Sequence, residues 1–121
     1  MMRIKMVFLS IILFSGAAEA DVRSLKKPDF NDLEALETYR QDLFSIYSQC
    51  SDAAEVRRLS RDEVDACSFV FLKLKLSFLN GVTVERYATM KPSLRATANR
   101  KGYDSYRAWL HRHRADAAIL Q

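Results

Sequence analysis

The chain contains only two cysteines, Cys50 and Cys67, and this pair constrains the fold more than any other feature of the sequence. Two cysteines allow a single intramolecular pairing. A disulfide requires Cα atoms about 5–6 Å apart, so any fold that forms it must bring the two flanking segments side by side. The fold prediction therefore depends on whether these segments are helices or strands.

The segment that follows Cys67 contains FLKLKLSFL (residues 71–79), an alternation that would also suit a strand. The residues before it favour a helix, because Ser60 and Glu63 have the spacing of an N-terminal capping box. Apolar residues then recur at steps of three and four, and Gly81 is a suitable stop. We predict a helix, with the strand as the alternative. Its two apolar arcs are Val64, Cys67, Phe71, Leu74 and Phe78, and Phe69, Leu72, Leu76 and Leu79, beside a thin polar face of Lys73, Ser77 and Asn80.

The segment that precedes and includes Cys50, residues 28–50, has the same character. Asn31 and Glu34 have capping spacing, and an apolar stripe follows at helical intervals. Leu33, Phe44 and Tyr47 widen this stripe. We predict a second helix whose inner stripe consists of Leu36, Tyr39, Leu43, Ile46 and Cys50. The polar stretch SDAAEVRRL is then expected to connect the two helices.

An antiparallel hairpin of these two helices would place Cys50 and Cys67 at equal distances from a loop near Arg58. We therefore predict a Cys50–Cys67 disulfide, which would contribute roughly 3 kcal/mol for a loop of this length. Two buried free thiols are the alternative. Redox catalysis is disfavoured because the sequence has no C-x-x-C motif.

Three shorter helices are expected in the C-terminal part. Thr83 can cap a helix through Met90, and Pro92 suits the first turn of another that ends near Lys101, with Gly102 as its stop. Asp104 can then cap a final helix, residues 105–120, whose inner face would carry Tyr106, Leu110, Ala117 and Leu120 with Trp109 alongside. The predicted fold is all-α: a small helical bundle built on a disulfide-stapled antiparallel hairpin, with shorter C-terminal helices.

The first twenty residues have the pattern of a secretory signal peptide. Arg3 and Lys5 form a basic start, residues 6–14 are apolar, and Ala18 and Ala20 supply a small-x-small cleavage site. The apolar run is shorter than the roughly 20 residues of a membrane span, so an uncleaved anchor is the weaker alternative. We predict cleavage after Ala20, export to the periplasm or exterior, and a single helical domain over residues 21–121.

The predicted exported chain has opposite charges in its two halves. Residues 21–72 contain 7 basic and 11 acidic residues, whereas residues 73–121 contain 10 basic and 3 acidic ones. The basic half can be a solvated face paired with the acidic first helix, a docking face for an acidic protein, or a contact for anionic polymers or lipid headgroups. Export disfavours nucleic acid as the ligand. The candidate binding face consists of Arg95, Arg100, Lys101, Tyr103, Arg107, Trp109, Arg112 and Arg114.

The sequence offers little for metal binding or catalysis. His111 and His113 project to different sides of a helix, and we expect His113 to be packed or partly buried instead of binding a metal. No glycine-rich phosphate loop or nucleophile elbow is present, so we expect no cofactor and no enzymatic activity. The expected function is binding of a partner protein, as an inhibitor, immunity factor, accessory subunit or chaperone. The alternative is binding of an anionic membrane or polysaccharide, and a small hydrolase is less favoured.

Overall fold

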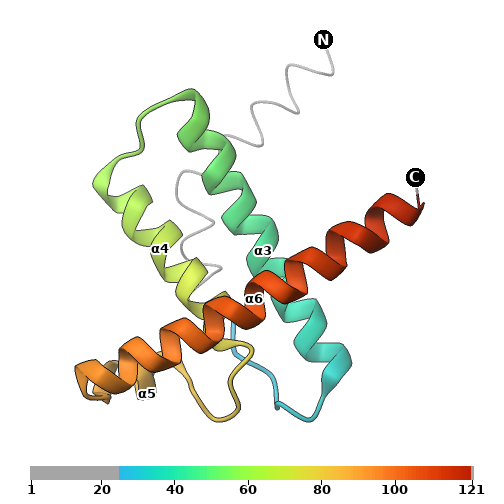
Figure 1. Ribbon diagram of the computed structural model, residues 1–121. Helices are drawn as coiled ribbons and strands as arrows, with labels where there is room; N and C mark the ends of the chain where they lie inside the picture. Colours follow the sequence, from blue (N-terminus) through green and yellow to red (C-terminus); the bar gives the residue numbers. More distant parts are fainter. Residues whose placement is uncertain (1–24, 121) are drawn as a thin grey trace. The chain divides into compact units, whose positions relative to one another are not determined.

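The computed structural model describes residues 25–120, and the side chains of residues 25–115. Four helices occupy this part of the chain and no strand occurs in it: α3 (Leu33–Val56), α4 (Arg61–Leu76), α5 (Val84–Thr89) and α6 (Pro92–Leu120) (Figure 1). The prediction of an all-α fold is therefore confirmed. The predicted signal peptide lies outside the described residues. Contacts divide the described chain into two compact units, residues 25–71 and 72–120, and the division falls within α4.

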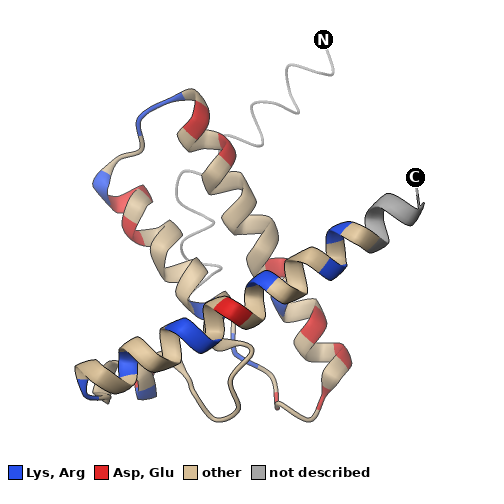
Figure 2. Ribbon diagram, in the orientation of Figure 1, with Lys and Arg blue, Asp and Glu red and all other residues tan. Residues whose placement is uncertain are grey.

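Helix α3 begins one residue later than a cap at Asn31 would place it. The N-cap is Asp32, whose carboxylate accepts the N–H of Ala35 at 3.1 Å. Asn31 instead donates its N–H to the side chain of Asp29 at 3.0 Å, which forms a turn before the helix. Acidic residues near the starts of α3 and α4 lie where the helix dipole favours them (Figure 2).

The inner stripe of α3 largely matches the prediction. Leu36, Tyr39, Leu43 and Cys50 are buried and Ile46 is half-buried. Leu33 was expected to widen the stripe, but it is 72% exposed at the first position of the helix. The predicted end was also wrong, since α3 continues six residues past Cys50. The segment SDAAEV is polar, yet alanine and glutamate are good helix formers, and the helix ends only where Arg57 adopts an extended backbone.

Helices α3 and α4 form an antiparallel hairpin around the loop 57–60 (Figure 1). The disulfide Cys50–Cys67 joins them with a Cα–Cα distance of 6.0 Å, as predicted. The rings of Tyr47 and Phe71 stack with their centroids 4.5 Å apart. In each of these two contacts, the two residues lie at nearly equal distances along the chain from the middle of the loop. The disulfide and the ring stack therefore fix the register of the hairpin at two points about one helical turn apart. The strand alternative for residues 71–79 is excluded.

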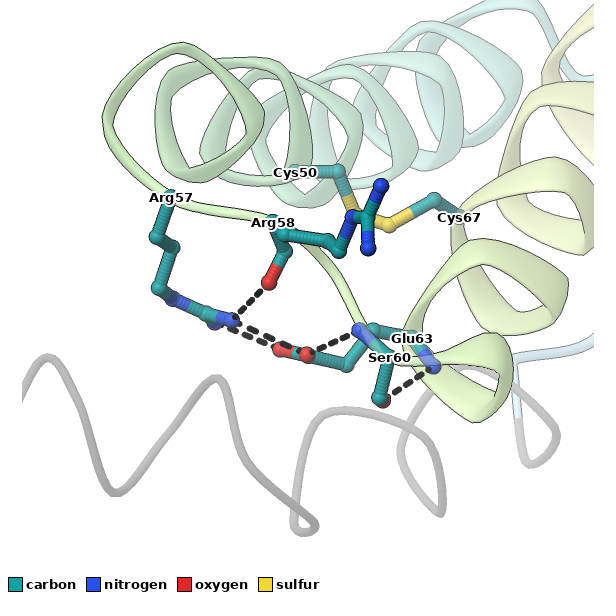
Figure 3. A network of polar contacts seen from close by, with 6 residues as sticks. All are labelled: Cys50, Arg57, Arg58, Ser60, Glu63 and Cys67. Atoms are coloured by element: carbon teal, nitrogen blue, oxygen red, sulfur yellow. Dashed lines mark hydrogen bonds and ion pairs between the residues drawn. A yellow bond between two sulfur atoms is a disulfide. The ribbon is translucent and has the colours of Figure 1, made fainter.

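The predicted capping box sits at the centre of a polar network beside the disulfide (Figure 3). Ser60 Oγ accepts the N–H of Glu63 at 3.2 Å, and Glu63 Oε1 accepts the N–H of Ser60 at 2.9 Å. The guanidinium of Arg57 donates to both oxygens of the same carboxylate. The hydrogen bond from Arg57, followed by that from Ser60, lowers the pKa of Glu63 to about 2. One side chain thus ties the end of α3 to the start of α4.

Helix α4 and the residues that follow it differ from the prediction in three ways. The helix stops at Leu76, and the chain tightens through i→i−3 hydrogen bonds before it turns at Gly81, whose φ is +73°. Ser77 was placed on a polar face, yet it is completely buried. Its hydroxyl donates to the carbonyl of Leu74 at 2.6 Å, which satisfies the polar group. Val70, which neither predicted arc contained, is buried together with Leu74 and Leu76.

Helix α5 begins where predicted, because Thr83 Oγ1 accepts the N–H of Arg86 at 3.1 Å. Pro92 starts α6, also as predicted, but Gly102 does not end it and Asp104 does not cap a new helix. A single helix of 29 residues runs from Pro92 to Leu120.

Gly102 is required for close packing. A Cβ atom at this position would lie 2.6 Å from the carbonyl oxygen of Lys75, so only glycine allows the two backbones to approach this closely. Ala98, Tyr106 and Trp109 are buried on the same side of α6. Trp109 meets the edge of Phe78 at a ring-centroid distance of 6.1 Å.

Replacing both cysteines by serine should lower the free energy of unfolding by roughly 3 kcal/mol, because the unfolded chain regains the freedom of the closed loop. Urea denaturation of the two proteins measures the difference. Reduction with dithiothreitol is the control: it should shift the midpoint of the wild-type protein and leave the Cys50→Ser, Cys67→Ser variant unchanged. Equal midpoints before and after reduction of the wild type would contradict the prediction.

Glu63→Gln should destabilise the protein in a pH-dependent way. The folded state lowers the pKa of Glu63 from 4.5 to about 2, so its charged form stabilises the fold fully above the unfolded pKa. The benefit decreases as the pH falls below 4.5 and is lost near pH 2. Thermal unfolding at pH 7, 4 and 2 should show the two proteins converging at acid pH. Asp42→Asn, at an exposed position of α3, should show no comparable convergence.

Gly102→Ala has two opposing effects, a gain in helix propensity and a clash with the backbone of Lys75. If only helix propensity mattered, alanine would stabilise α6 by about 1 kcal/mol. The contact with the Lys75 carbonyl should instead cost about 1–3 kcal/mol, so we expect a lower unfolding midpoint. Ala96→Gly, at an exposed position of the same helix, measures the propensity alone. A Gly102→Ala variant with a raised midpoint would contradict the close-packing role.

Candidate functional site

Helix α6 carries all eight residues of the candidate binding face. Its sequence contains six basic and two acidic residues, and the basic positions are distributed along its length (Figure 2). The eight residues do not share one side of the helix. Their position around the helix axis and their contacts separate them into three groups.

The first group is a row of three arginines, Arg100, Arg107 and Arg114, spaced seven residues apart. Seven residues are almost two helical turns, so the three side chains start from nearly the same side of α6, roughly 10.5 Å apart along the axis. All three are exposed. We refer to them as the arginine row. No ion pair joins them to an acidic side chain within the described residues.

Tyr103 belongs beside this row. It is 40% exposed, and the guanidinium carbon of Arg107 lies 6.0 Å from the centre of its ring. This geometry is a cation–π contact, which at an exposed site is worth about 0.5–1 kcal/mol. Because Tyr103 is four residues before Arg107, the contact orients the guanidinium along the helix surface. The row thus combines three cations with one exposed aromatic ring.

Lys101 and Arg112 form the second group, on a different side of α6. Arg112 is five residues after Arg107, which rotates it roughly 140° around the helix. Both side chains are exposed, and neither forms an ion pair with another residue whose side chain is described. The basic surface of α6 therefore faces two directions, and a binding partner would meet different residues on each side.

Arg95 and Trp109 make up the third group, and both have structural contacts. Arg95 is half-buried and donates from Nη1 to the carbonyl of Met90, the C-cap of α5, at 2.8 Å. Trp109 is only 5% exposed. Arg95 thus joins the end of α5 to α6, and Trp109 is buried against Phe78, so neither residue offers much surface to a partner.

Two lysines near the end of α4 differ from the cations of α6. Lys73 and Lys75 are half-buried, and burial lowers the pKa of both amines. The charge of Glu85 partly opposes this effect at Lys73. The ammonium of Lys75 donates to Oδ1 of Asn99 in α6. These groups therefore belong to the packing of residues 72–120 and add little to its exposed basic surface.

His111 was not predicted to belong to the candidate face. It is exposed and lies between Arg107 and Arg114 on the side of the arginine row. The seven-residue spacing of the arginines would have identified this side of the helix in the sequence if α6 had been predicted as one continuous helix. His113 stacks on Trp109 with ring centroids 5.2 Å apart, as the packing prediction required, but the residue is exposed and not partly buried.

Residues 25–115 contain no group of three or more histidine, cysteine, aspartate or glutamate side chains that could hold a metal ion. Among the residues described, none of the helices combines the length and apolarity of a membrane span. Comparisons of the chain with protein-family models, curated proteins and solved structures find no match.

Proposed function

We propose that this chain is a small exported protein without enzymatic activity that binds a partner protein through the basic surface of α6. Export is supported by the signal-peptide pattern of residues 1–20. It is also supported by the disulfide between α3 and α4, since such bonds persist in oxidising compartments. The proposed role is that of an inhibitor, immunity factor, accessory subunit or small chaperone.

The arginine row is the observation that carries this proposal. Its three guanidinium groups are exposed, regularly spaced and without an acidic partner among the side chains of residues 25–115. Arginine presents a planar set of donors that matches a carboxylate in two parallel hydrogen bonds. A protein surface with acidic side chains would therefore be both attracted and oriented by this row.

The second candidate is binding of an anionic polysaccharide or membrane, and the regular spacing of the row favours it. A linear polyanion could contact Arg100, Arg107 and Arg114 in succession. Such binding is mainly electrostatic and should be lost at high salt. Binding to anionic vesicles or to dextran sulfate at low ionic strength, measured alongside the protein partner, distinguishes the two candidates.

The double variant Arg107→Glu, Arg114→Glu should weaken partner binding at least about tenfold, because two attractions become repulsions. The tagged mature chain captures its partner from the periplasmic or secreted fraction, and calorimetry with the purified partner gives the dissociation constant. The matched control is Arg86→Glu, Lys91→Glu, which makes the same charge change at exposed positions outside α6. Equal affinity of the wild type and the Arg107→Glu, Arg114→Glu variant would reject binding through this surface.

A further inference from the structure

The last described turns of α6 lose their packing while the helix continues. Tyr106 and Trp109 are 6% and 5% exposed, and Leu110 is half-buried. Every residue from His111 to Ala115 is exposed. Because consecutive residues are about 100° apart around a helix, five exposed residues in a row cover all of its sides. The stack of His113 on Trp109 is the last ring contact in this direction.

Cations surround this exposed segment. Arg107 and Arg114 belong to the arginine row, whereas Arg112 lies roughly 140° from the first and roughly 160° from the second. None of the three forms an ion pair with a residue whose side chain is described. The segment from Arg107 to Ala115 contains no acidic residue. It is therefore a basic helical peg, with positive charge on opposite sides and exposed side chains over residues 111–115.

We propose that this basic helical peg, residues 107–115, inserts into an acidic cleft of the partner protein. The inference rests on the proposed function and specifies the chemistry of the partner. A cleft with carboxylates on both walls would meet Arg112 on one side and Arg107 and Arg114 on the other. A helix held in a groove is a common mode of recognition, and exclusion of water between the walls strengthens each charged contact.

A flat or linear ligand would use only part of this charge. A membrane surface or a single polyanion strand touches one side of a helix, so either Arg112 or the arginine row would remain in water. A cleft is the arrangement that uses both sides at once. The helix is exposed on all sides over residues 111–115, which leaves room for the walls of a cleft.

Photo-crosslinking from three directions tests this geometry. In the full chain, each of Ala108, His111 and His113 is replaced in turn by p-benzoylphenylalanine, which samples three sides of the helix and keeps all three arginines. The cleft predicts an adduct of the same mass, with the same partner protein, from all three positions. Adducts from one or two adjacent sides, adducts between two copies of this chain, adducts without a discrete protein, or no adducts would overturn the proposal.

Charge reversal on opposite sides provides the second measurement. With the purified partner, Arg112→Glu and Arg114→Glu should each raise the dissociation constant at least tenfold, and Arg86→Glu should change it less than twofold. If only Arg114→Glu weakens binding, the partner contacts one side and the cleft is wrong, while the proposed function stands. Normal binding by the Arg107→Glu, Arg114→Glu variant, in contrast, would reject the proposed function itself.

Discussion

The hairpin of α3 and α4 depends on one covalent link at a defined register. Cys50 and Cys67 are bonded, and Tyr47 stacks on Phe71 one turn further from the loop. At the loop itself, the carboxylate of Glu63 receives hydrogen bonds from both flanking segments. The disulfide restricts the conformations of the unfolded chain. The ring stack and the Glu63 carboxylate stabilise the folded state. Together they hold two helices against each other, and such packing supplies most of the stability of helices in proteins.

The candidate site depends on a different contact, the close approach of Gly102 to the carbonyl of Lys75. Because Gly102 serves packing and does not end a helix, α6 continues without interruption. Continuity is what aligns Arg100, Arg107 and Arg114, since residues seven apart share a side only within one helix. A break at Gly102 would have placed Arg100 on a separate helix with an independent direction. The helix in which Gly102 makes this close contact is therefore the same continuous helix that aligns the arginine row.

The structure also distinguishes cations that are engaged in packing from cations that are exposed, whereas the sequence gives only their number. Arg95 is engaged by the carbonyl of Met90, and the amine of Lys75 by Asn99. Arg107 and Arg112 remain exposed on different sides of α6. Net charge therefore overstates the surface available to a partner. Exposure and position around the helix decide which charges a partner can reach. They reduce the candidate face to the arginine row with Tyr103, and to Lys101 and Arg112 on another side of α6.

Local patterns in the sequence were sufficient for the all-α class, the capping box of Ser60 and Glu63, and the pairing of the two cysteines. These features involve residues close together or a single possible pairing, so short-range physical rules apply to them. The continuity of α6, the burial of Ser77 and the separation of the candidate face were decided only by the tertiary structure. A glycine in a helical sequence permits both a stop and a close approach, and the sequence does not show that the backbone of Lys75 lies against Gly102. The side of α6 that each arginine occupies follows from the continuity of the helix.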